Sequence, residues 1–209
     1  MLRCNYTAVY FNYQESSGEF KAIARVEAGM KEPFETPKHG HLSLTDDDTA
    51  MAVMFNTASS KTPVVKYGEN PQDLKHQAKG TSTTCHAPAN VLGQRAFRDP
   101  GYMHTVIMTE LKPDTYYYYQ YGHEEYGLSR VRRFKSRPPK TTKYANFIAY
   151  ADMGTYSEPG SSSTAGRVYE DVVSGGYDSF VLHFGDIRYD RKWVPLSGWI
   201  VVSHIHGYA

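Results

Sequence analysis

The chain has 209 residues, enough for one large domain or two small ones with a real hydrophobic core. Its 23 basic and 22 acidic residues leave a formal net charge of +1, which argues against binding to nucleic acid or to an anionic membrane surface, because both need a basic excess. Two cysteines exclude a disulfide scaffold, no apolar stretch is long enough to span a membrane, and the start, MLRCNYTAVYF, lacks a signal-peptide pattern. The 18 tyrosines favour β structure.

Short alternating apolar runs, separated by turn signals, predict a β-sandwich in the first two thirds of the chain. The expected strands are 41–44, 51–56, 64–67, 103–108, 115–121 and 129–134. The sequence Leu-Lys-Pro-Asp-Thr-Tyr-Tyr at 111–117 is typical of a tyrosine corner, in which the Tyr117 hydroxyl reaches back to upstream backbone. It indicates a fibronectin type III-like sandwich. We expect the tyrosines at 116–119 to alternate between core and surface rather than to form a ligand platform.

The composition changes near Ser136, where SRPPKTTK reads as a linker. Beyond it, apolar runs at 147–151 and 180–184 predict two strands. Between them, apolar residues at helical spacing predict one face of a helix, capped by Ser163 or Thr164 and ended by Gly175-Gly176: Ala165, Val168, Tyr169, Val172 and Val173. Strand, helix and strand together indicate a βαβ unit of a parallel sheet. Two strands are too few for such a sheet, so apolar strand edges should be exposed.

We therefore expect a two-domain protein, a β-sandwich followed by an incomplete α/β (βαβ) domain. The predicted boundaries are 1–38 for an N-terminal extension with a strand, 39–137 for the sandwich, 138–143 for the linker and 144–209 for the α/β part.

Two carboxylates follow the predicted parallel strands. Asp152 comes directly after the first strand, and Asp186 two residues after the second. Ligands bind at the carboxyl ends of strands in open α/β sheets, and adjacent strands lie about 4.8 Å apart, so the two side chains can converge. A bound hard cation would relieve their repulsion, and a carboxylate bridging two metals would build a hydrolytic centre. Tyr189 is close enough in sequence to aim a phenolate at the same metal.

The strings that hold these residues resemble metal-binding blocks of a known family. Tyr150-Ala151-Asp152-Met153-Gly154 and Gly185-Asp186-Ile187-Arg188-Tyr189 are similar to the first two blocks of purple acid phosphatases, in the metallophosphoesterase superfamily, written Gly-Asp-x-Gly and Gly-Asp-x-x-Tyr. Residues 97–104 and 111–122 look like that family's fibronectin-like N-terminal domain, and 2–6 like an early strand.

The resemblance implies an enzyme that hydrolyses small phosphomonoesters at a binuclear centre of Fe(III) and a divalent metal, Zn, Mn or Fe. Asp152 would bind the ferric ion, Asp186 would bridge both metals, and Tyr189 would be the ferric phenolate ligand that gives the purple colour. It also implies a secreted or endomembrane location and a possible homodimer. The glycosylation sequence Asn5-Tyr6-Thr7 has meaning only in a secreted protein.

The remaining ligands of the family are missing from these residues. The family adds an asparagine from a Gly-Asn-His-Glu block and histidines from later blocks, including Gly-His-x-His, but no Asn-His pair occurs here. His204 and His206 form a His-x-His sequence that we do not expect to substitute, because Ser203 replaces the glycine and the position in the chain differs. The segment 191–206 departs from the family and reads as an inserted piece, such as unremoved non-coding sequence. We expect a truncated phosphatase with little or no activity and no assigned catalytic residue.

Two alternatives remain open from the sequence. The chain could be a fibronectin-like binding or adhesion module with a vestigial catalytic part, in which case 39–137 should fold and bind a partner alone, or a fragment without function. The histidines, His104 among them, are expected to be structural, and Asp46-Asp47-Asp48 a solvated turn, although three carboxylates could hold calcium weakly.

Overall fold

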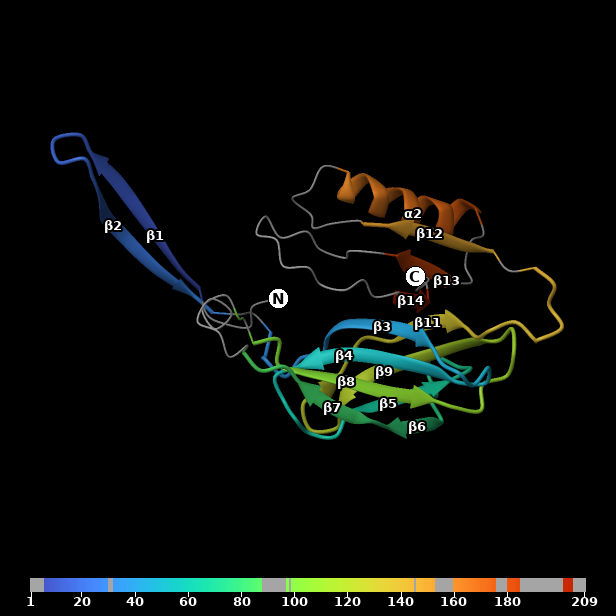
Figure 1. The fold of residues 1–209 in the computed structure, drawn as a ribbon. Helices are drawn as coiled ribbons and strands as arrows, with labels where there is room; N and C mark the ends of the chain where they lie inside the picture. Colours follow the sequence, from blue (N-terminus) through green and yellow to red (C-terminus); the bar gives the residue numbers. More distant parts are fainter. Residues whose placement is uncertain are drawn as a thin grey trace.

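The computed structural model describes most of the chain (Figure 1). The described ranges are 6–29, 32–87, 97, 99–144, 146–152, 160–175 and 180–184, together with the backbone of 201–204. Among these residues, no helix is long and apolar enough to cross a membrane.

Two antiparallel sheets pack face to face to form a β-sandwich (Figure 1). One contains the strands β3 (Lys38–Leu44), β4 (Met51–Thr57), β8 (Tyr102–Met108) and β7 (Thr81–Thr84), in that order. The other contains β11 (Arg132–Lys135) and β10 (Gly127–Leu128), both paired with β9 (Tyr116–His123), then β5 (Val64–Gly68) and β6 (His76–Lys79). The strands expected in this region are present, with shifted ends.

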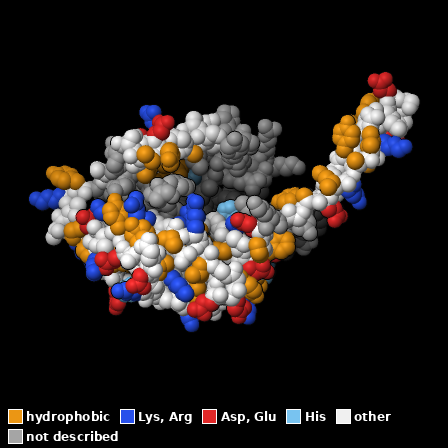
Figure 2. Space-filling model, turned by 180° about the vertical axis from the view of Figure 1, so that it is seen from behind, with side chains coloured by type: hydrophobic (Ala, Val, Ile, Leu, Met, Phe, Trp, Pro, Cys, Tyr) orange, Lys and Arg blue, Asp and Glu red, His pale blue; other side chains and the backbone are white. Residues whose placement is uncertain are grey.

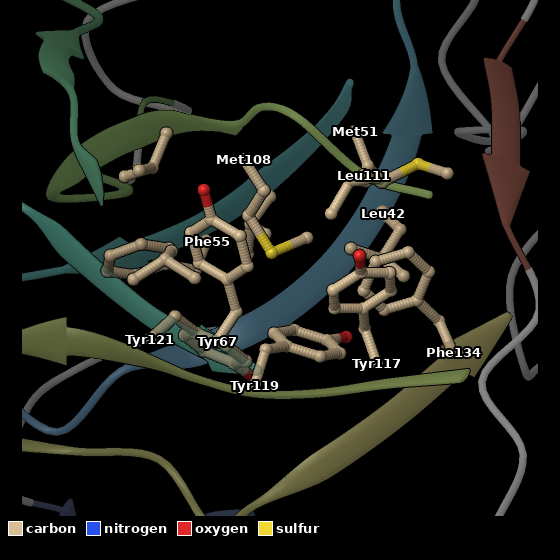
Figure 3. Packing of buried hydrophobic residues seen from close by; sticks show 13 residues of the cluster. Leu42, Met51, Phe55, Tyr67, Met108, Leu111, Tyr117, Tyr119, Tyr121 and Phe134 are labelled. Atoms are coloured by element: carbon tan, nitrogen blue, oxygen red, sulfur yellow. The ribbon is translucent and has the colours of Figure 1, made fainter. Parts of the chain in front are cut away.

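The sandwich core forms because apolar side chains alternate along the strands of both sheets. Most of the strand β4 is buried, as expected for a central strand between β3 and β8. Side chains from the two sheets meet in a single cluster (Figure 3), which contains Leu42, Met51, Val53, Phe55, Val65, Tyr67, Val106, Met108, Leu111, Tyr117, Tyr119, Tyr121 and Phe134.

The tyrosines of β9 alternate as the sequence predicts. Tyr117 and Tyr119 are buried in the core, whereas Tyr116 is 47% exposed. The Tyr117 hydroxyl oxygen accepts a hydrogen bond from the backbone N–H of Lys112 at 3.0 Å, which confirms the predicted contact with upstream backbone. This bond ties the turn before β9 to the core.

The strands β1 (Tyr6–Gln14) and β2 (Glu19–Ala28) form an antiparallel hairpin apart from the sandwich (Figure 1). We expected only a single strand in this extension, at 2–6, and residues 2–5 lie outside the described part. A bulge at Ile23 shifts the register, because Tyr10 pairs with Ala24 and Phe11 with Ala22.

After the linker, the chain forms the expected strand–helix–strand unit. The strands β12 (Phe147–Ala151) and β13 (Phe180–Phe184) pair in parallel, and α2 (Ser161–Gly175) lies between them in sequence. The helix ends at Gly175 as predicted but begins at Ser161, directly after Gly160, so the predicted cap at Ser163 or Thr164 was placed three to four residues too far along the chain. The Ser163 hydroxyl instead donates to the carbonyl oxygen of Gly160.

The apolar face predicted for α2 is only partly covered. Val168 and Val172 are half-buried, but Tyr169 is 52% and Val173 66% exposed. The sequence pattern therefore predicted the helix correctly and placed too many residues on its buried side.

One strand joins this unit to the sandwich. β14 (Val201–His204) pairs antiparallel with β13 on one side and with β3 on the other, giving a seven-stranded sheet in the order β12-β13-β14-β3-β4-β8-β7. The inner edge of β13 is thus paired rather than exposed, contrary to our expectation for this edge. The two-domain boundaries stay a prediction.

Candidate metal centre

Asp152 lies at the carboxyl end of β12, beside the end of β13. Ala151 pairs with Phe184 in the parallel register, and the next backbone N–H, that of Asp152, donates a hydrogen bond of 3.0 Å to the carbonyl oxygen of Phe184. Asp152 has a φ of 47° and an exposed side chain. Aspartate adopts this left-handed conformation more readily than most residues, and such positions gather at functional sites.

Asp186 and Tyr189 lie outside the described residues, so their placement stays a prediction. Asp186 follows Phe184 by two residues, and Phe184 is the residue bonded to Asp152. The described backbone thus brings together the two strand ends from which the predicted ligands emerge. In the part of the chain that is described, no group of three or more His, Cys, Asp or Glu side chains could hold a metal ion.

The His-x-His sequence near the end of the chain starts far from Asp152. His204 is the last residue of β14, and the residue before it, Ser203, pairs with Val181 near the amino end of β13. Because Asp152 lies at the carboxyl end of β13, His204 is at the opposite end of the strand. His206 lies outside the described residues.

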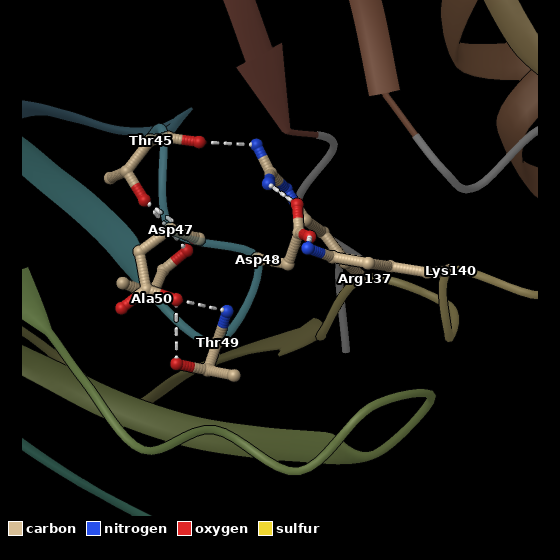
Figure 4. A network of polar contacts seen from close by, with 7 residues as sticks. All are labelled: Thr45, Asp47, Asp48, Thr49, Ala50, Arg137 and Lys140. Atoms are coloured by element: carbon tan, nitrogen blue, oxygen red, sulfur yellow. Dashed lines mark hydrogen bonds and ion pairs between the residues drawn. The ribbon is translucent and has the colours of Figure 1, made fainter.

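In the acidic turn Asp46-Asp47-Asp48, the carboxylates of Asp47 and Asp48 are bound by other side chains and backbone of this chain (Figure 4). Asp47 accepts hydrogen bonds from the backbone N–H and hydroxyl of Thr49, and these bonds lower the pKa of its carboxyl group. Asp48 forms ion pairs of 2.7 Å with both Lys140 and Arg137. The bond from Lys140 is the main cause of the lowered pKa of Asp48. These contacts favour a structural turn over the calcium site.

The same turn holds the start of the linker. Arg137 also donates a hydrogen bond of 2.7 Å to the carbonyl oxygen of Thr45. The neighbouring Ser136 hydroxyl donates to the carbonyl oxygen of Lys112 at 2.5 Å and accepts from the N–H of Thr115 at 2.9 Å. The chain therefore leaves the sandwich in a direction fixed by Asp48 and Ser136.

A buried polar network, which no pattern in the sequence indicates, joins the two sheets. The Thr57 hydroxyl contacts Nε2 of His104 at 2.8 Å and Nε2 of His123 at 3.1 Å. Nδ1 of His104 contacts the Ser82 hydroxyl at 2.8 Å. Both rings and Thr57 are almost completely buried.

Further partners complete the network around Thr57 and His123. The carbonyl oxygen of Thr62 can only accept, so Nδ1 of His123 donates to it at 3.2 Å. The Thr57 hydroxyl also donates to the carbonyl oxygen of Ser59 and accepts from the N–H of Ser59, both at 3.1 Å. Every ring nitrogen of the two histidines has a partner. The role of these histidines is structural.

An open cleft of about 430 Å³ lies beside the carboxyl end of β7 and the amino end of β8. Its lining includes Thr84, Cys85, His86, Asp99 and Tyr102. The Cys85 thiol is exposed and free. The described residues of this cleft supply no set of ligands for a metal.

Comparisons with known proteins agree with the β-sandwich fold of the first two thirds of the chain. The family model described as "Purple acid Phosphatase, N-terminal domain" matches residues 37–136. The chain is 33% identical over 176 residues to "Probable inactive purple acid phosphatase 9" of Arabidopsis thaliana, covering 76% of this chain and 27% of that protein. It is 32% identical over 160 residues to "Probable purple acid phosphatase 20" of the same plant, covering 77% of this chain and 33% of that protein. The chain belongs to the purple acid phosphatase family.

A solved structure shows the same fold. The purple acid phosphatase PPD1 from yellow lupin (Lupinus luteus) seeds matches 90% of this chain and 36% of its own, with a TM-score of 0.72 and 21% sequence identity. The chain spans about a third or less of the length of the two Arabidopsis thaliana relatives.

Proposed function

We propose that this chain carries the ferric half of a binuclear phosphomonoesterase site and, as these 209 residues stand, has little or no phosphatase activity. The observation that carries the proposal is the hydrogen bond from the N–H of Asp152 to the carbonyl oxygen of Phe184. It supports a site at the adjacent ends of β12 and β13, where ligands of α/β sheets bind.

The donors at this edge suit a ferric ion. The carboxylate of Asp152 is exposed at the strand end, and Asp186 and Tyr189 would supply a second carboxylate and a phenolate from the segment after β13. Oxygen ligands of this kind favour hard, highly charged cations. A bound ferric ion would acidify a water molecule strongly enough to provide hydroxide at acid pH. The role of these residues is to hold and orient that ion.

Hydrolysis by the family's mechanism needs a second, divalent metal that clamps the substrate oxygens. The chain contains no Asn-His pair to supply the ligands that the family uses for it. Several relatives carry the word "inactive" in their names, among them purple acid phosphatases 1, 9 and 27 of Arabidopsis thaliana. This naming supports the proposal of low activity. The binding-module alternative has no comparable support, and a secreted or endomembrane location is proposed from the family alone.

The test is turnover of p-nitrophenyl phosphate at acid pH with iron and zinc supplied. We expect no turnover above that of the metals alone. Turnover that disappears in Asp186→Asn and survives in the matched control Asp73→Asn, which lies between β5 and β6 of the other sheet, would contradict the proposal.

A further inference from the structure

The outer face of the sheet that contains β11, β9, β5 and β6 carries tyrosine rings next to basic side chains. Along β9, Tyr116 and Tyr118 alternate with tyrosines of the core cluster and therefore point away from the core. Along β11, Arg133 and Lys135 lie on either side of the buried Phe134 and share the same outer face. Figure 2 shows basic and apolar side chains next to one another on this side of the sandwich.

The strand register places these cations directly beside the rings. Arg133 is opposite Tyr118, and Lys135 is opposite Tyr116. The guanidinium carbon of Arg133 lies 4.8 Å from the centroid of the Tyr116 ring, and the ammonium nitrogen of Lys135 lies 5.8 Å from it. Contacts of this kind position a cation before any ligand arrives. The Tyr116 side chain is still 47% exposed, so a ligand can reach its ring.

Further basic side chains lie on the other side of the tyrosines. Lys66 lies between two core residues of β5, the strand that pairs with β9, and so points outward. Lys79 of β6 follows Ala78, which packs against the core, and shares this outer face. At this end of the face, the carboxylate of Glu124 accepts a hydrogen bond of 2.9 Å from the side-chain amide of Gln77. The outward tyrosines therefore lie between two sets of cations.

The basic side chains of this face are only partly neutralised. Asp114 forms an ion pair of 2.6 Å with Lys135. Among the described residues, Arg133, Lys66 and Lys79 take part in no ion pair. Three cations on one sheet face are therefore available to a ligand whose negative charges are spaced apart.

We propose that this face binds a linear polyuronate, an acidic polysaccharide with one carboxylate on each sugar. The flat C–H face of a sugar ring packs on an aromatic ring, and Tyr116 and Tyr118 offer two such rings along one strand. The carboxylates pair with Arg133 on one side of these rings and with Lys66 on the other, and a guanidinium binds a carboxylate through two parallel hydrogen bonds. The binding uses no residue of the candidate metal centre, so it stands apart from the proposed phosphatase site.

The shape and charge of the face favour this ligand over other anions. Outward side chains on one strand repeat about every 6.8 Å, which suits an extended polymer better than a small anion held in a pocket. Nucleic acid and anionic membranes need a larger basic excess than a chain with a net charge of +1 supplies. An acidic peptide offers carboxylates but no sugar rings for the tyrosines. The sequence pattern assigns these tyrosines only a surface position, because the cations beside them come from other strands.

The test is isothermal titration calorimetry of the whole chain with oligogalacturonates of defined length at low ionic strength. We expect binding that weakens as salt is added, because the cations are at the surface. The methyl-esterified form of the same oligosaccharide keeps the sugar rings and removes the charge, whereas polyglutamate keeps the charge and removes the rings. Each should bind about tenfold more weakly or worse.

Single substitutions separate the two parts of the proposed contact. Arg133→Gln and Lys66→Gln remove a charge, Tyr118→Ala removes a ring, and each should weaken binding by about threefold or more. The matched controls are on the β1–β2 hairpin, where Arg25→Gln and Tyr10→Ala remove the same kinds of side chain from exposed positions. Both controls should bind like the unmodified chain. Thermal unfolding checks that each variant keeps the folded sandwich.

Several results would overturn the proposal. These are an absence of binding at low ionic strength, equal binding of the methyl-esterified oligosaccharide, and equal weakening by the two hairpin controls. Polyglutamate that binds as tightly as the oligogalacturonate would also overturn it, because the ligand would then be an acidic peptide recognised by charge alone. The comparison of ligands uses the unmodified chain, so its result does not depend on the folding of any variant.

Discussion

The backbone N–H of Asp152 donates to the carbonyl oxygen of Phe184 at 3.0 Å, and this bond joins two strands that are 29 residues apart in sequence, counted from Ala151 to Phe180. It fixes the point at which the chain turns out of β12. The φ of 47° at Asp152 departs from the extended conformation of the strand before it. A conformation of this kind persists when surrounding contacts hold it, and the bond to Phe184 is one such contact.

The hydrogen bond at Tyr117 should contribute measurably to the stability of the sandwich. In Tyr117→Phe, the N–H of Lys112 loses its acceptor while the ring stays in the core. We expect the free energy of unfolding to fall by about 1–2 kcal/mol, measured by urea denaturation. Tyr116→Phe is the matched control, because its ring is 47% exposed, and it should change stability little. Equal effects of both changes would disprove the role of this bond.

The hydroxyl of Thr57 should matter more than its methyl group. Thr57→Val keeps the shape but leaves Nε2 of His104 and Nε2 of His123 without their partner in a fully buried place. We expect a loss of about 2 kcal/mol or more in the free energy of unfolding. Thr57→Ser keeps the hydroxyl and should lose about 1 kcal/mol or less for the missing methyl group. The idea fails if serine costs as much as valine.

The ion pairs of Asp48 should stabilise the protein only above acid pH. Lys140 and Arg137 hold the pKa of Asp48 below its ordinary value of 3.8. The contribution is therefore present above the unfolded pKa and disappears as the pH falls through the lower folded pKa. Asp48→Asn should lower the melting temperature at neutral pH. It should have no effect at a pH so low that the Asp48 carboxyl is protonated in both the folded and the unfolded chain. The control Asp46→Asn, in the same turn, should have little effect at any pH. A melting-temperature difference for Asp48→Asn that persists in acid would refute this account.

The regular parts of the fold could be predicted because their side chains alternate with the right period. The strand β4 and the inward tyrosines 117 and 119 follow the pattern of a half-buried sheet. The strands β6 and β7 could not be predicted, since each has only four mostly polar residues, and Gly80 alone separates them. Their structure comes from pairing with β5 and β8.

Contacts between segments far apart in the chain also could not be predicted from the sequence. Gly40 lies within β3, and a Cβ atom there would lie 2.0 Å from the side chain of Tyr121, so packing requires glycine at this position. The Thr57–His104–His123 network joins strands far apart in the chain, and no spacing rule indicates it. At the candidate site, the position of Asp152 after an apolar run could be predicted, whereas its bond to Phe184 needs the register of two strands.

Iron binding tests the central claim most directly. Titration of the chain with Fe(III), followed by visible absorption, should give a tyrosinate-to-iron charge-transfer band. We predict that Tyr189→Phe removes the band and that Asp152→Asn, which keeps a residue tolerant of the left-handed φ, weakens iron binding by about tenfold or more. The control Tyr169→Phe, on the exposed side of α2, should keep the full band. An iron complex without the band, or a band unchanged in Tyr189→Phe, would contradict the proposed site.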